Sequence, residues 1–221
     1  MNKGIIEVWC AYYPIFLKGA IGTLEYAAIA VIFGSIVGTL IAFLHLSKNK
    51  VIGAIANVYV IVLRGTPLLV QMYIAYLFLP IAFPALNFIT KEQWVVISLI
   101  LNSSAYVSEI IRGGILSVDP GQMEAARSLG MSAKNCMIKI ILPQAVKAIL
   151  PSLAGEYISM IKETSLAGTF MMYELMYTRV LLLNKYLTWQ PLFIISGMYL
   201  VMTTVLTWLS GLLEKRLAES D

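Results

Sequence analysis

Long apolar stretches separated by short polar segments dominate the pattern of hydrophobic positions along the chain. A membrane-spanning helix needs about 20 mostly apolar residues. The first stretch holds one charge, Glu25, and the fourth holds Pro151 and Glu156. We predict about five spanning helices, over residues 21–44, 65–83, 94–111, 146–161 and 186–213.

The composition supports this prediction. Of the 221 residues, 59% are hydrophobic and 13% are charged, whereas about a quarter of the residues of a soluble domain are charged. So much apolar surface excludes a water-soluble globule and a disordered chain. We therefore expect an all-α integral membrane protein that forms one transmembrane domain over residues 1–221.

Cysteine and histidine exclude several kinds of site. Cys10 and Cys136 lack the spacing of a metal site, and the predicted topology puts them on opposite sides of the membrane, so we expect neither a metal site nor a disulfide. His45 is the only histidine, which excludes sites that need two. We expect it to lie at the membrane interface.

Lysine and arginine set the orientation, because cytoplasmic loops carry an excess of both. We place the richer set of loops inside and the poorer set outside. This puts the amino terminus outside and the carboxyl terminus inside, as an odd number of spans requires. The inner set is Lys48, Lys50, Arg64, Arg112, Arg127, Lys134, Lys139, Lys147, Lys215 and Arg216, and the outer set is Lys3, Lys18, Lys91, Lys162, Arg179 and Lys185.

The region before and within the first span has two further features. Residues 1–18 hold several aromatic side chains and lack the compact apolar block of a signal peptide, so we expect an external interfacial segment. Inside the span, Ala30, Gly34, Gly38 and Ala42 recur every fourth residue. Small residues at this spacing let two helices approach closely in lipid, and we expect a helix contact there.

The segment after the third predicted span has residues typical of both ends of a short helix. Asp119 is a good N-cap, Pro120 suits the first helical position, and Gly130 supplies a left-handed stop. Ser132 can cap the helix that follows. Local physics leaves two alternatives open: a helix that docks into a partner protein, or an amphipathic helix resting on lipid headgroups.

This segment also resembles a known family. Glu124-Ala125-Ala126, then Gly130, then nine residues to Ile140, and finally Leu142-Pro143 look like the signature loop of permeases of ATP-binding-cassette (ABC) importers. Four further segments resemble the polar-amino-acid branch of that family. They are Arg64-Gly65-Thr66-Pro67-Leu68-Leu69, Asn102-Ser103-Ser104-Ala105-Tyr106, Asp119-Pro120-Gly121-Gln122 and Lys162-Glu163-Thr164-Ser165-Leu166.

The resemblance implies a fold and an activity. The fold is that of a type I importer permease, with a five-helix core and an external amino terminus. The activity is translocation of a polar amino acid, of the arginine, glutamine, histidine or cystine class, across the bacterial plasma membrane by ATP-driven alternating access. Residues 119–143 would be the cytoplasmic coupling loop, and Glu124, Ala125, Ala126 and Gly130 would belong to the coupling helix that docks into the ATPase.

The resemblance also implies the partners. They are a dimer of cytoplasmic ATPase subunits, a second copy of the permease or a homologous permease, and an external amino-acid-binding protein, besides membrane lipid; we expect no nucleic acid. The chain lacks the G-x-x-x-x-G-K-[ST] loop that cradles ATP phosphates. We therefore expect no cofactor and no enzymatic activity in this chain, with ATP and Mg²⁺ bound by the separate ATPase.

Glu156 is the leading candidate for contact with a substrate, because an ionisable group at membrane depth is costly and points to function. Its carboxylate suits the ammonium or basic side chain of an amino acid, and hydroxyl and amide donors suit the carboxylate. By resemblance, the positions of Asn102, Ser103, Glu156 and Ser159 line the translocation cavity, and we add the neighbouring Met160. The alternatives are that Glu156 pairs with a lysine or arginine, or lies near a membrane interface.

Other polar residues favour structural roles. We expect Glu109 and Arg112, three residues apart, to form a local ion pair. We expect Arg64 to pin helices or lipid headgroups at a cytoplasmic helix entry.

Two other classes of protein are alternatives to the importer hypothesis. A secondary transporter or channel usually needs more spans or polar rings around a pore. A membrane enzyme would need paired catalytic groups, and neither class explains the segment around Glu124.

Overall fold

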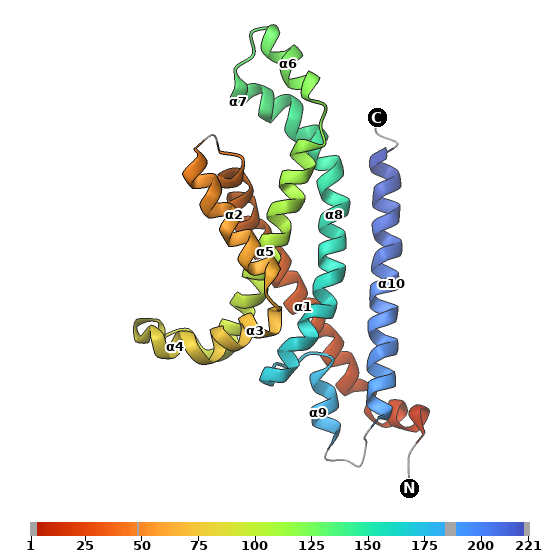
Figure 1. Cartoon of the computed structure of the whole chain (residues 1–221). Coiled ribbons are helices and arrows are strands. Elements are labelled where there is room, and N and C mark those ends of the chain that lie inside the picture. Colours follow the sequence, from red (N-terminus) through yellow and green to blue (C-terminus); the bar gives the residue numbers. More distant parts are fainter. Residues whose placement is uncertain (1–3, 48, 184–188, 219–221) are drawn as a thin grey trace.

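The computed structural model describes residues 4–47, 49–183 and 189–218, and these residues are almost entirely helical (Figure 1). In chain order the elements are α1 (Ile5–His45), α2 (Lys50–Gly65), α3 (Leu68–Tyr73), η1 (Ile74–Phe78), α4 (Leu79–Ala82), η2 (Pro84–Leu86), α5 (Lys91–Leu116), α6 (Pro120–Ser128), α7 (Ala133–Cys136), η3 (Met137–Ile141), α8 (Leu142–Glu163), η4 (Thr164–Phe170), α9 (Tyr177–Leu183) and α10 (Gln190–Ala218).

Four helical segments are long and apolar enough to cross a membrane, and a bent pair of helices raises the number to five. This confirms the prediction of an all-α membrane protein with about five spans. The amino and carboxyl ends lie at opposite ends of the molecule, and α6 lies at the same end as the carboxyl terminus (Figure 1). The predictions for residues 1–3 and for Lys48, Lys185 and Tyr186 concern positions outside the described residues.

The small residues of α1 form its contact with α5, as predicted. Ala30, Gly34, Gly38 and Ala42 are all buried. A Cβ atom added at Gly34 would lie 3.0 Å from the Cβ of Ser103, and one added at Gly38 would lie 2.7 Å from the carbonyl oxygen of Ser104. The two backbones therefore approach so closely that a side chain at Gly38 would force them apart, and one at Gly34 would press on Ser103.

Replacing Gly38 with valine should separate α1 from α5. Overpacking a close contact costs about 1–3 kcal/mol, so we expect a lower midpoint of thermal unfolding for the purified protein. Gly211→Val is a matched control, because a Cβ added at Gly211 meets nothing within 4 Å. Equal midpoints for the two variants would contradict the role of Gly38.

The second span differs from the prediction. Residues 65–83 do not form a straight helix; instead α2 and the segment Leu68–Ala82 meet at an angle of 103°. The break follows from Thr66 and Pro67, because proline lacks an N–H and disfavours helical geometry in the residue before it. Thr66 is extended, with φ −118° and ψ 146°. The predicted range began at the bend and left α2 out.

Side chains satisfy the backbone groups that the break exposes. The Thr66 hydroxyl donates to the carbonyl oxygen of Val62 at 2.7 Å. The Gln71 amide donates to the carbonyl oxygens of Leu63 at 2.8 Å and Thr66 at 3.0 Å. Buried carbonyls without partners are costly in lipid, so these bonds stabilise the bend.

The predicted fourth span, 146–161, lies inside a longer helical run over Ala133–Phe170. Its π-helical turn, η3, lies just before Pro143. The proline ring cannot donate to the carbonyl four residues earlier, so the α-helical hydrogen-bond ladder is interrupted here, and π turns occur mostly as single-turn bulges within α-helices. The predicted third span lies within α5, and residues 190–213 of the fifth lie within α10.

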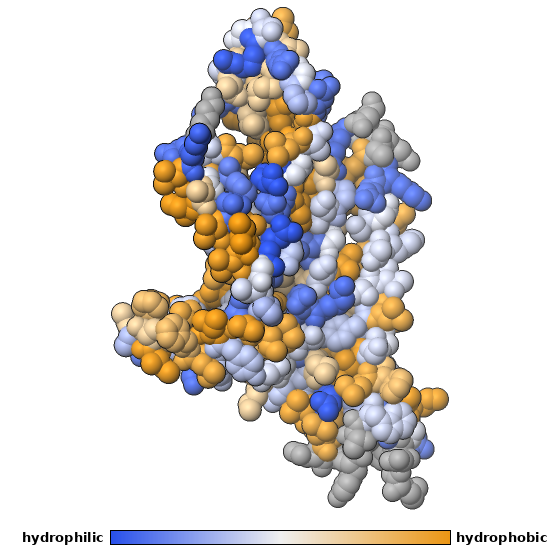
Figure 2. All heavy atoms as spheres, viewed as in Figure 1, coloured by the Kyte–Doolittle hydropathy of each residue, from blue (hydrophilic) through white to orange (hydrophobic). Residues whose placement is uncertain are grey.

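The surface sorts apolar from polar residues. Apolar residues cover α2, α3 and α4 on the face that Figure 2 shows, as expected for helices in contact with lipid or with another membrane protein. A band of hydrophilic residues runs between α2 and α8 on the same face (Figure 2). This band leads to the cavity described next.

Candidate functional site

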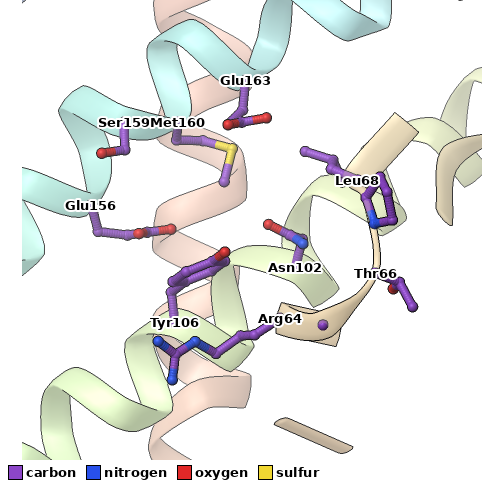
Figure 3. Close-up of a pocket in the computed structure, with 11 residues that line it drawn as sticks. Arg64, Thr66, Leu68, Asn102, Tyr106, Glu156, Ser159, Met160 and Glu163 are labelled. Carbon is purple, nitrogen blue, oxygen red and sulfur yellow. The ribbon is translucent and has the colours of Figure 1, made fainter. Parts of the chain in front are cut away.

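A cavity of about 550 Å³ opens where the bend after α2 faces α5 and α8. Figure 3 shows side chains from all three elements pointing toward it. The lining consists of Arg64, Gly65, Thr66, Pro67, Leu68, Asn102, Tyr106, Glu156, Ser159, Met160 and Glu163. Four of the five residues predicted to contact substrate therefore meet in one cavity.

Glu156 lies on the cavity wall, with 9% of its surface exposed. Its described polar partner is a hydroxyl and not a lysine or arginine, because the Ser103 Oγ donates to the Glu156 Oε1 at 2.9 Å. Ser103 is the one predicted contact residue outside the lining. It is fully buried between α1 and α5, so its place is behind Glu156, where it holds the carboxylate.

Asn102 ties the bend to α5. Its side-chain amide donates to the carbonyl oxygen of Leu63 and to the Gln71 Oε1, both at 3.3 Å. Gln71 in turn bonds the carbonyls exposed at the break. The shape of this wall of the cavity therefore depends on Asn102 and Gln71 together.

Arg64 corrects one prediction. We expected it at a helix entry, pinning helices or lipid headgroups, but the residue lies in the last turn of α2 and lines the cavity. It does contact a second helix, since its Nη1 lies 3.7 Å from the Oε2 of Glu109 on α5. Its guanidinium carbon lies 5.1 Å from the centre of the Tyr106 ring, within the range of a cation–π interaction, and Figure 3 shows the two side chains next to each other. The cavity is thus lined by one basic residue, Arg64, and two acidic ones, Glu156 and Glu163.

Sequence reasoning missed Arg64, Thr66, Tyr106 and Glu163 as cavity residues. The signal was present, because Arg64, Thr66, Tyr106 and Glu163 all lie in the segments that carry the family resemblance. The Thr66-Pro67 pair inside an apolar stretch also marked a bend, and polar residues at a bend within a membrane face a cavity or protein interior.

The segment around Glu124 has the predicted helix and caps. The Asp119 carboxylate accepts a hydrogen bond from the Gly121 N–H at 2.8 Å, and Gly130 has a φ of +84°, in the left-handed region that glycine tolerates. Glu124 and Ala125 are exposed, whereas Ala126 is buried with Ile115 and other residues of the same chain. The side chain of Ala126 therefore faces inward, away from any docking partner.

Comparison with known proteins agrees with this geometry. Residues 30–219 match the family described as binding-protein-dependent transport system inner membrane component. The chain belongs to this family. It is a multi-pass inner membrane component of a bacterial ABC transporter and is not itself catalytic, since a separate ATPase binds ATP.

Individual relatives narrow the class of permease. A putative glutamine transport system permease protein, GlnP of Rickettsia bellii, is 38% identical over 92% of this chain and 93% of its own length. The arginine transport system permease protein ArtQ of Bacillus subtilis is 36% identical over 94% of both chains. This permease is the subunit of an amino acid importer, as predicted, and works with an ATPase and a binding protein.

Solved structures support the fold. One chain in the crystal structure of an amino acid ABC transporter with histidines is 40% identical and has a TM-score of 0.90, over 98% of the permease and all of that chain. A chain of the MetNI methionine ABC transporter is 13% identical with a TM-score of 0.79, which shows a shared fold only. The type I importer fold predicted from the sequence is therefore confirmed.

Proposed function

We propose that the cavity binds one polar amino acid of the glutamine, arginine or histidine class as a zwitterion. The observation that carries the proposal is the charge pattern of the lining, which holds one basic side chain and two carboxylates. Arg64 would take the substrate carboxylate, because a guanidinium presents N–H donors in a fork that matches carboxylate geometry. Glu156 and Glu163 would take the ammonium or a basic side chain.

The other lining residues set the fit. Asn102 and Ser159 offer neutral polar groups, and Met160 offers an apolar, adaptable contact. Ser103 acts through Glu156, since its hydroxyl bonds that carboxylate. Relatives named for transport of glutamine and arginine support the same class of substrate.

We also propose how the permease assembles. The helix α6 with Glu124, Ala125 and Gly130 would dock into a groove of the ATPase, and Ala126 would anchor α6 to the permease from the other side. A second copy of the chain or a homologous permease would lie across the membrane domain from the first, with lipid around both. Exposed apolar side chains on α2 and α10 suit either neighbour.

Replacing Glu156 with glutamine tests the cavity. We expect about tenfold weaker binding of arginine, because a charge-assisted hydrogen bond is about twice as strong as a neutral one, and a smaller change for glutamine. Equilibrium binding of labelled amino acids to the permease–ATPase complex in nanodiscs measures this. Superimposable competition profiles for the variant and the parent would contradict the assignment.

A further inference from the structure

Glu109 lies two helical turns after Asn102 on α5, and three basic side chains from three helices surround its carboxylate. Arg112 donates two hydrogen bonds to it, Nε to Oε1 at 3.0 Å and Nη2 to Oε2 at 2.8 Å. The Arg64 Nη1 from α2 lies 3.7 Å from Oε2, and the His45 Nδ1 from α1 lies 3.6 Å from Oε1. The predicted pair of Glu109 and Arg112 is thus confirmed as part of a larger cluster.

The contact between Arg64 and Glu109 differs from the bond made by Arg112. A distance of 3.7 Å is within ion-pair range and beyond that of a hydrogen bond. Since Arg112 already occupies both oxygens of Glu109, the carboxylate attracts the Arg64 guanidinium without taking up its donors. An arginine has five N–H donors, so those of Arg64 stay available for another acceptor.

The position of Arg64 decides which acceptor that is. Arg64 lines both the cavity described above and a second, polar pocket of about 510 Å³ lined by His45, Asn57, Glu109 and Arg112. Tyr106 contacts one face of the guanidinium, and Glu109 attracts one of its nitrogens. Together they hold a long, flexible side chain in the wall between the two pockets.

We propose that Glu109 is a positioning residue, which fixes Arg64 so that its guanidinium faces the cavity and binds the carboxylate of the amino acid. This inference rests on the proposed function of the cavity. The guanidinium of Arg64 stays protonated, and because Arg112 makes both hydrogen bonds to Glu109, the donors of Arg64 remain available for the substrate. Without Glu109, Arg64 has more rotamers to lose when substrate binds, and ordering such a side chain weakens affinity.

The test compares each amino acid with the amine that remains when its carboxylate is removed. The pairs are arginine with agmatine, glutamine with 4-aminobutanamide, and histidine with histamine. Binding to the permease–ATPase complex in nanodiscs is measured without the binding protein, because that protein has its own specificity. For Glu109→Gln we expect about tenfold weaker binding of the amino acid, from the ordering cost alone, and unchanged binding of the amine.

Three variants complete the design. Glu109→Asp keeps the charge at a longer distance, so its loss should be intermediate and again confined to the amino acid; it serves if Glu109→Gln does not assemble. Glu92→Gln removes an exposed carboxylate from the far end of the same helix and should bind like the parent. In an Arg64→Ala background, Glu109→Gln should have no further effect, because it acts through Arg64.

The outcomes separate the two proposals. If Arg64→Ala weakens the amino acid and the amine equally, the carboxylate site itself is wrong. If Arg64→Ala discriminates between them and Glu109→Gln does not, the cavity proposal stands and the positioning role is overturned. A loss for Glu109→Gln that adds to the loss for Arg64→Ala also overturns it.

Discussion

Gly130→Val should reduce uptake strongly while the complex still assembles and hydrolyses ATP. Gly130 has a φ of +84°, which a β-branched residue avoids because of steric strain. The turn between α6 and α7 must then change direction, and α6 no longer presents Glu124 to the ATPase in the same orientation. We expect uptake by proteoliposomes to fall at least about tenfold, since small misplacements of a coupled element cost about that much or more.

Two comparisons make this result specific to coupling. Gly113→Val is the matched control, because a Cβ added at Gly113 meets nothing within 4 Å and its φ is not in the left-handed region. Glu124→Ala should also reduce uptake relative to ATP hydrolysis, since Glu124 is exposed on α6. Normal uptake in both Gly130→Val and Glu124→Ala would contradict a coupling role for α6.

Glu174→Gln should cause the largest loss of stability. Glu174 lies in the connection between η4 and α9, outside the spans, and is fully buried. Its carboxylate accepts hydrogen bonds from the Met176 N–H at 2.7 Å, the Tyr177 N–H at 2.6 Å and the Tyr199 hydroxyl at 3.0 Å. Both carboxylate oxygens accept hydrogen bonds. In glutamine an NH₂ group replaces one of these oxygens, so one of the present donors would lose its acceptor and meet another donor.

Above about pH 7, where the carboxylate is ionised, we expect Glu174→Gln to lower the free energy of unfolding by about 2–4 kcal/mol, because a buried donor would lose its partner. Thermal unfolding of the purified permease measures the change as a lower midpoint. Glu25→Gln is the control, since Glu25 is exposed on the neighbouring helix α1. Equal midpoints for the two variants would show that the three hydrogen bonds contribute nothing net.

The same residue gives the permease a pH dependence of stability. Burial raises the pKa of Glu174 to about 7 from a usual value of 4.5, although the hydrogen bonds to its carboxylate oppose the shift. The folded state then binds a proton that the unfolded chain has released, so stability falls as pH rises from about 4.5 to about 7 and is flat above. The Glu174→Gln variant should lack this slope. A slope that is unchanged in the variant would assign it to other groups.

The sequence predicted the parts of the fold that depend on nearby residues. The contact of α1 with α5 follows from small residues at a fixed spacing, and the caps of α6 follow from Asp119 and Gly130. The bend after α2 was missed because the apolar run 65–83 is long enough to span, and a hydropathy window does not register Thr66 and Pro67 as a break.

The candidate site was predicted only in part, for a related reason. Asn102, Glu156, Ser159 and Met160 came from two helices that were placed correctly, so they meet in the cavity. Arg64 was counted among the charges of cytoplasmic loops. Its actual place in a wall of the cavity depends on the position of the bend, which was not predicted. Ala126 faces inward for a reason that only the packing of α6 against α7 and η3 reveals.

The interruption between Gly65 and Leu68 has a mechanical consequence. The helix α2 and the segment Leu68–Ala82 could rotate relative to each other about Pro67 while each keeps its own backbone hydrogen bonds. An unbroken helix would instead have to be strained along its length. Since Pro67 itself forms part of the cavity wall, a few degrees of pivoting would change the width of the chamber directly. Such pivoting would have to break or exchange the bonds from Gln71 to the carbonyl oxygens of Leu63 and Thr66, so the side chain that holds the bend would also resist a change in the width of the cavity.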